Sequence, residues 1–435
     1  MTTELVGVLS LVVIVAMVML RVPVAVAMGI VGTIGYAIVD DWSSALNRIG
    51  NTPFELAEGY SLSVVPLFML MGAVASRSGM SQDLFRAANG LFAGRRGTAA
   101  MAAVGASAGF GAICGSSLAT AATMSRIAIP EMRRLGYDER LAVGAVASGG
   151  TLAILIPPSV ILIVYAVMAQ DSVAQLFAAA LIPGLVLTVL HLIVIWALCR
   201  WRPELAPAAQ IAMRWPERLK AIAGMWQIVV LFGVSVGGIY IGFFSPTEAA
   251  AVGCLGAMLI GFATKRIGRE ELVASLVETV RTTAVLFFIV IMAFVYAYFL
   301  ILTHLPQSLV GLVTDLQLSP LTVMLLLVAF YVVLGCFLDS LGMILITVPV
   351  FLPLVLGLGY DSVWFGVLVV VVVEIGLITP PIGMNLFVIR AQQPEIGIGS
   401  LYRGVLPFLA ADAAFIALLF IFPALALWLP RVLFG

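Results

Sequence analysis

Asp339 is a carboxylate inside an apolar stretch, Val332–Val348. A charged aspartate at membrane depth is costly unless it is paired or binds a cation. Neither lysine nor arginine occurs between Arg281 and Arg390, so the sequence offers no nearby cationic partner. A bound Na⁺ ion or a proton is the simplest partner that we predict for this carboxylate.

Three further acidic residues lie in or beside apolar stretches. Glu374 precedes a proline pair, and we expect it to support a break in its helix. We expect Asp412 to hydrogen-bond a neighbouring helix. Glu248 follows Pro246 in the predicted first turn of another helix, where a carboxylate interacts favourably with the helix dipole.

Two proline pairs interrupt long apolar stretches. Pro157-Pro158 and Pro380-Pro381 each remove two N–H donors, and proline also disfavours helix in the residue before it. Such a break at membrane depth is tolerated only where it is buried or lines a cavity. The freed carbonyl groups, with Thr151 and Thr379, could coordinate a cation, while the following half-helix could face an anion. We predict broken helices over about 140–168 and 362–389.

A polar interruption precedes each proline pair by about forty residues. The first is Gly115-Ser116-Ser117 and the second is Asp339-Ser340. The apolar arms around them have roughly 12 to 18 residues, and at about 1.5 Å per residue several are too short to cross the hydrocarbon core. We predict two re-entrant hairpins, over about 98–130 and 320–352, whose tips meet the broken helices at the midplane.

The composition places these features in a membrane. Hydrophobic residues make up 63% of the 435 residues and charged residues only 10%, whereas soluble domains have roughly 25% charged residues. We predict an all-α polytopic membrane protein with about ten spans of about 20 residues each. The net charge of 0 gives no basic surface for nucleic acid. The four cysteines and two histidines lack metal-binding spacing and are interpreted as structural.

The positive charges predict the topology. Of the 22 Lys and Arg residues, all but Arg48 and Arg431 lie in segments that we assign to the cytoplasmic face. The first apolar run, Leu5–Leu20, is followed rather than preceded by arginine, so we interpret it as a retained membrane helix and not a signal peptide. The N-terminus is then extracytoplasmic.

An internal repeat relates the two halves. A shift of 223 residues aligns Pro130–Asp138 with Pro353–Asp361, the two proline pairs with each other, Ser117 with Ser340, and Pro23 with Pro246. The topology predicts that the two repeats are inverted relative to one another, as in many secondary transporters. We predict a first inverted repeat over 1–200, a cytoplasmic connector over 201–222 and a second inverted repeat over 223–435.

Four motifs resemble those of the large membrane subunit of tripartite ATP-independent periplasmic (TRAP) transporters. They are SPTEAAA at 245–251, GSSLAT at 115–120, GTLAILIPPS at 150–159 and GLITPPIGMNLF at 376–387. The resemblance covers nearly the whole chain. It departs from the family at Ala153, where the family often has glycine, and this affects local backbone freedom.

The resemblance implies a Na⁺-coupled importer that works by an elevator movement in the prokaryotic cytoplasmic (inner) membrane. It implies a small four-helix membrane subunit, expected as a separate chain, and an extracytoplasmic substrate-binding protein that delivers an organic acid with a carboxylate. By motif position it assigns Asn385 to the region of the second hairpin. It implies Na⁺ ligands at Gly115, Ser117, Thr151, Asp339, Ser340, Gly376 and Thr379, and substrate contacts at Ser116, Ser117, Thr151, Thr379 and Asn385.

Two other functions fit parts of the sequence. A stand-alone ion-coupled anion carrier or Na⁺/H⁺ exchanger could use the same architecture. An intramembrane serine hydrolase is suggested by Ser107, which stands in a GxSxG pattern. That pattern requires a strand–turn–helix and a histidine base, whereas this stretch is rich in small residues suited to close helix packing. We therefore predict a transporter and not an enzyme.

Overall fold

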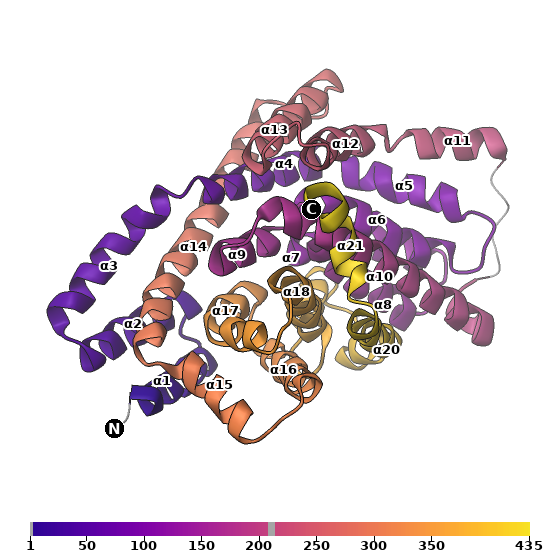
Figure 1. Cartoon of the computed structure of the whole chain (residues 1–435). Helices are drawn as coiled ribbons and strands as arrows, with labels where there is room; N and C mark the ends of the chain where they lie inside the picture. The colour runs from indigo at the N-terminus through magenta and orange to yellow at the C-terminus, as the bar shows by residue number, and fades with distance from the viewer. Residues whose placement is uncertain (1–2, 208–213) are drawn as a thin grey trace.

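The computed structural model describes residues 3–207 and 214–435, and all of their regular secondary structure is helical (Figure 1). The first half contains α1 (Thr3–Met19), α2 (Val24–Val39), α3 (Trp42–Ala57), η1 (Tyr60–Ser63), α4 (Val64–Arg77), α5 (Met80–Phe92), α6 (Thr98–Cys114), α7 (Ser117–Arg134), α8 (Glu139–Leu155), α9 (Val160–Ala169), α10 (Val173–Trp201) and η2 (Pro203–Leu205). The second half contains α11 (Trp215–Ala223), α12 (Trp226–Tyr240), α13 (Pro246–Ala263), α14 (Arg269–Leu302), α15 (Leu305–Asp315), α16 (Pro320–Gly335), α17 (Ser340–Gly357), α18 (Ser362–Ile378), α19 (Met384–Gln392), α20 (Ile398–Ile421) and α21 (Ala424–Phe434).

The helix bounds repeat along the chain. Helices α7 and α17 begin and end 223 residues apart, and so do α8 and α18. Their N-caps correspond as well, because Ser116 and Asp339 cap the first pair while Asp138 and Asp361 cap the second. Both proline pairs contain a cis peptide bond. The repeat in the sequence is therefore also a repeat of helices, while the boundaries and the inverted orientation of the two halves stay predictions.

Many of the helices are apolar enough to cross a membrane. Among the described residues, five helices could do so alone by length and composition, namely α10, α13, α14, α17 and α20. Counting each of the bent pairs α4–α5, α8–α9 and α11–α12 as one span raises the number to eight. Six shorter apolar helices, including α6, α16 and α18, complete the set. The predicted all-α polytopic membrane fold is confirmed.

Some helices include polar residues that the apolar runs did not indicate. The polar segment near residues 40–60 forms α3, whose first turn is capped by the Asp41 carboxylate. Helix α14 begins at Arg269, although its apolar run starts near residue 282. The apolar run marks only the part of a helix at membrane depth, so it misses the polar turns. Of the predicted connector, residues 208–213 lie outside the described residues.

The hairpin arms and the broken helices form the centre of the molecule. In Figure 1, α17 and α18 lie in the middle, with α3 and α14 towards one side and α11, α12 and α13 along another. Every residue of α18 from Val363 to Ile378 is buried, and every residue of α8 from Leu141 to Leu155 is buried too. A helix that is apolar on all sides belongs in such an interior. Glu374 is the one charged residue within α18.

Candidate functional site

The tip of the first hairpin lies against the first proline pair. Helix α6 ends at Gly115, whose φ of 62° is a left-handed conformation that favours glycine. A Cβ atom at this position would stand 2.5 Å from the carbonyl oxygen of Pro158. The backbone N–H of Val160 donates to the carbonyl oxygen of Gly115 at 3.5 Å. The hairpin tip and the broken helix α8–α9 therefore meet backbone to backbone.

The second repeat has the same arrangement. The thiol of Cys336, at the end of α16, donates to the carbonyl oxygen of Pro380 at 3.6 Å. A Cβ atom on Gly376 would lie 2.6 Å from the Cα atom of Gly335, so α16 and α18 touch through their backbones. In the first repeat a similar contact joins Gly111 to Ala153, whose Cα atom would stand 2.2 Å from a Cβ atom on Gly111. Small residues allow this approach in both halves.

Asp339 lies at the second hairpin tip and is half-buried. Its carboxylate caps α17 by accepting the N–H of Gly342 at 3.1 Å. The aspartate thus has a partner in the N-terminal backbone of α17 in place of a cationic side chain. Its carboxylate remains half-accessible, and its role as a Na⁺ ligand stays a prediction.

Glu374 is the most deeply buried carboxylate at the site, with 3% of its surface exposed. Its Oε1 atom accepts a hydrogen bond from the Ser340 hydroxyl at 3.3 Å. Its Oε2 atom has no hydrogen-bond partner among the described residues. The Ser117 side chain also faces this carboxylate. A buried carboxylate with an unsatisfied oxygen requires a proton or a cation, and the sequence had indicated only a supporting role for this residue.

Asn385 connects the two repeats. Its Nδ2 atom donates to the hydroxyl oxygen of Ser117 at 2.6 Å, and both residues are buried. Its Oδ1 atom has no hydrogen-bond partner within the described part of the chain. The motif had assigned Asn385 to the region of the second hairpin, but the structure brings it to the first hairpin tip. Helix α19 follows the second proline break and packs against α7, which explains this placement.

Thr151 lies near the end of α8, four residues before Leu155, and Thr379 is the C-cap of α18. The Thr151 hydroxyl donates to the carbonyl oxygen of Ser148 at 2.7 Å, and that of Thr379 donates to the carbonyl oxygen of Ile375 at 2.6 Å. Each hydroxyl uses its proton within its own helix, so its oxygen stays available as an acceptor. Carboxylate, amide and hydroxyl oxygens are the ligands that a hard cation prefers.

A cavity of about 830 Å³ reaches the first hairpin tip from outside. Ser116 and Thr123 line it together with Arg126, an exposed residue of α7. Arg77 of α4 and Glu278 of α14 also line the cavity and form an ion pair at 2.6 Å. Arg126 has no ion-pair partner among residues 3–207 and 214–435 under a 4.0 Å criterion. The sequence had indicated only that Arg126 marks the cytoplasmic face. Its position nine residues after Ser117 was the one signal that could have linked it to the site.

Asp412, Glu248 and Ser107 take part in helix packing or capping, although Ser107 Oγ and Asp412 Oδ2 lack a hydrogen-bond partner among the described residues. His191 of α10 and Asp412 of α20 are both buried, with the His191 Nε2 atom 2.8 Å from the Asp412 Oδ1 atom. The predicted bond from Asp412 to a neighbouring helix is therefore confirmed. Glu248 accepts the Ser245 N–H at 2.8 Å in a capping box at the start of α13. Ser107 lies within α6 against Gly149 of α8, so it has no strand–turn–helix context.

The chain matches known transporters over nearly its whole length. The sequence model of the family described as "Tripartite ATP-independent periplasmic transporter, DctM component" matches residues 11–425. The C4-dicarboxylate TRAP transporter large permease protein DctM of Pseudomonas aeruginosa is 37% identical over 87% of this chain and 88% of its own length. The sialic acid TRAP transporter large permease protein SiaM of Vibrio cholerae is 32% identical over 87% of this chain and 88% of its own. These relatives are permeases and not enzymes.

Solved structures share the fold. The YdaH transporter of Alcanivorax borkumensis has a TM-score of 0.61 at 18% identity, with 88% of this chain and 89% of that chain covered. MtrF of Neisseria gonorrhoeae has a TM-score of 0.51 at 14% identity, with 90% and 85% covered. At these identities the likeness concerns the fold alone. The family match and the identities to two large permeases go further, and the chain belongs to the DctM family, the large permease component of tripartite ATP-independent periplasmic transporters.

Proposed function

We propose that this chain is the large permease subunit of a TRAP-type secondary transporter that imports a carboxylate-containing organic acid by coupling to Na⁺. The observation that carries the proposal is the convergence of Ser117, Glu374 and Asn385, from both repeats, with two oxygen atoms that lack a hydrogen-bond partner among the described residues. Such oxygens suit a hard cation. The guanidinium of Arg126, in the adjoining cavity, suits a carboxylate.

The names of the relatives support an anionic substrate. They concern C4-dicarboxylates, sialic acid and isethionate, which are all organic anions. The family name supports an assembly of three components. We propose that the other two are a small four-helix membrane subunit and an extracytoplasmic substrate-binding protein, and that the assembly resides in the prokaryotic inner membrane with the N-terminus of this chain outside.

An elevator movement would carry the site across the membrane. The hairpins and the broken helices would move as one body past the peripheral helices, with Na⁺ and the organic acid bound. A bare carboxylate such as Glu374 is expensive to move through hydrocarbon, whereas a carboxylate neutralised by Na⁺ is not. Each net positive charge moved inward gains about 2.3 kcal/mol per 100 mV. An excess of Na⁺ over substrate charge therefore makes uptake sensitive to voltage.

Reconstitution tests this proposal. The chain is placed in liposomes with its small subunit, and the binding protein is added with a radiolabelled ligand. We expect uptake under an inward Na⁺ gradient and little uptake when choline replaces Na⁺ outside. Equal uptake without Na⁺ would contradict the coupling. Equal uptake without the binding protein and small subunit would favour the stand-alone carrier or exchanger instead.

A further inference from the structure

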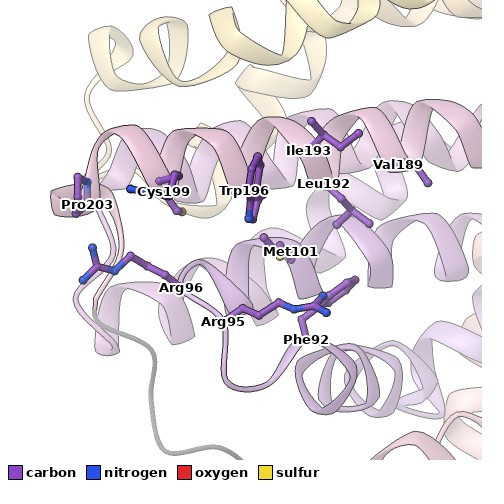
Figure 2. A pocket seen from close by; sticks show the side chains of 11 residues that line it. Phe92, Arg95, Arg96, Met101, Val189, Leu192, Ile193, Trp196, Cys199 and Pro203 are labelled. Atoms are coloured by element: carbon purple, nitrogen blue, oxygen red, sulfur yellow. The ribbon is translucent and has the colours of Figure 1, made fainter.

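A groove on the surface of the first half combines arginine side chains with an apolar wall. It has a volume of about 750 Å³ and lies between the C-terminal turns of α10 and the loop that joins α5 to α6. Figure 2 shows Leu192 and Trp196 pointing from α10 towards Met101 and Arg95. The loop contributes Arg95 and Arg96, and α10 contributes Arg200.

The loop is fixed against α10 by its own backbone. Gly94 and Gly97 flank the two arginines and have φ angles of 85° and 84°, a conformation that favours glycine. A Cβ atom on Gly97 would stand 2.7 Å from the Sγ atom of Cys199, so the loop backbone touches the end of α10. The Thr98 hydroxyl donates to the carbonyl oxygen of Arg95 at 2.6 Å. Both arginines are thereby held beside the last turn of α10.

The three arginines have no acidic partner in the described part of the chain. None of them lies within 4.0 Å of a carboxylate oxygen in residues 3–207 and 214–435. The sequence of 208–213 contains no aspartate or glutamate. Figure 2 shows Arg96 extending towards the end of the groove at Pro203, while Arg95 extends the other way, towards Phe92. Arg200 belongs to the last turn of α10, so Arg96 and Arg200 supply positive charge at that end, where an anion would be favoured.

The wall of the groove continues along α10 as an apolar stripe. Val189, Ile193 and Trp196 are spaced about one turn apart and are 52%, 50% and 58% exposed. Helix α10 is long and apolar enough to cross a membrane, so an exposed apolar stripe on it suits contact with acyl chains. Trp201, which is 80% exposed at the end of the helix, is typical of the interface between the membrane and water. Arg96 and Arg200, near this end of α10, therefore suit the headgroup region, and the stripe suits the acyl chains.

We propose that this groove binds an anionic phospholipid. Its phosphate group would bind Arg96 and Arg200, and one acyl chain would lie along Val189, Ile193 and Trp196. Basic pockets between membrane helices on the cytoplasmic side recognise acidic headgroups in this way. A soluble phosphate would satisfy the arginines but would leave the apolar wall uncovered. The phospholipid satisfies both parts of the groove.

Native mass spectrometry of the purified complex, with its small subunit, tests the proposal. Phosphatidylglycerol and phosphatidylcholine with identical acyl chains are added in equal amounts. We expect the complex to retain phosphatidylglycerol preferentially. The double variant Arg96→Gln/Arg200→Gln should reduce that retention about tenfold, since each arginine near the headgroups contributes appreciably. The control Arg86→Gln/Arg134→Gln removes the same charge outside the groove and should have little effect.

A second variant distinguishes the lipid from other occupants. Trp196→Ala should weaken phosphatidylglycerol retention severalfold, and excess glycerol 1-phosphate should not displace the lipid. Thermal unfolding of each complex verifies folding. If the control variant loses as much phosphatidylglycerol retention, the effect comes from surface charge in general, and the proposal is overturned. Displacement of the lipid by glycerol 1-phosphate would overturn the proposal in favour of a soluble phosphate ligand. Lipid retention by the isolated chain but not by the complex would overturn it too, because the small subunit would then occupy the groove.

Discussion

The side-chain amide of Asn385 donates a hydrogen bond of 2.6 Å to the hydroxyl oxygen of Ser117. The two residues are 268 positions apart, one after the second proline pair and the other at the first hairpin tip. Glu374 stands beside this contact and has an oxygen without a hydrogen-bond partner among the described residues. A ligand bound there would touch both repeats, as expected of a transport site between two repeats.

The Ser117–Asn385 contact should behave as one unit in transport. We expect Ser117→Ala and Asn385→Ala each to lower the initial rate of Na⁺-driven uptake roughly tenfold, because each removes the same buried hydrogen bond. The double variant should be no slower than the slower single variant, because both changes affect one contact. Ser125→Ala is the control, since that hydroxyl bonds only the carbonyl oxygen of Ala121 in its own helix. If the double variant instead lowers the uptake rate by the product of the two single effects, the two residues do not act through one contact.

Arg126 should affect substrate passage and leave the docking of the binding protein unchanged. We expect Arg126→Gln to lower uptake about tenfold, because a bidentate guanidinium–carboxylate contact is lost. Binding of the loaded binding protein to the reconstituted transporter, measured by surface plasmon resonance, should be unchanged. Arg134→Gln is the matched control, since Arg134 is 70% exposed and pairs with Glu131. Normal uptake by the Arg126 variant would remove this residue from the substrate path.

Asp339→Asn separates two roles of this residue. Asparagine also caps helices well, so α17 should keep its N-terminus and the protein should be expressed normally. The loss of charge should raise the Na⁺ concentration needed for half-maximal uptake. Asp361→Asn is the control, because Asp361 caps α18 through the N–H groups of Val363 and Trp364. If the Na⁺ titration of the Asp339 variant matches that of the wild type, Asp339 does not bind the ion.

The His191–Asp412 pair should matter for stability. We expect Asp412→Ala to lower the free energy of unfolding by about 1–3 kcal/mol, because it leaves a buried imidazole without its partner. The double variant His191→Leu/Asp412→Leu should lose less stability than the sum of the two single leucine variants. Thermal unfolding in detergent measures each effect. Additive losses in the double variant would show that the two side chains act independently.

The repeated elements could be predicted from the sequence because proline and helix caps act locally. The proline pairs, Ser116 and Asp339 determine where helices end and begin, and these local effects explain why α17 and α18 match α7 and α8 at an offset of 223 residues. The polar turns of α3 and α14 could not be found, because apolar runs indicate only the depth of the membrane.

The composition of the site could be predicted only in part. Ser117 and Asn385 were both candidates, but their contact depends on how α19 packs against α7, and sequence spacing contains no information about that packing. The same is true of Arg126. The sequence indicated only a positive charge at the predicted cytoplasmic face, because its position in the cavity depends on how the helices pack. Glu374 gave a weaker signal than Asp339, because one nearby proline pair suggested a purely structural role.

We propose that Na⁺ binds at the carboxylate of Glu374, between the two repeats. Glu374→Gln keeps the shape of the side chain and the acceptor for the Ser340 hydroxyl but removes the charge. The most direct measurement is a Na⁺ titration of uptake in proteoliposomes that contain the full transporter. We predict that the variant needs at least about ten times more Na⁺ for half-maximal uptake, with the folded complex intact. A titration curve that coincides with that of the wild type would show that Na⁺ does not bind at Glu374.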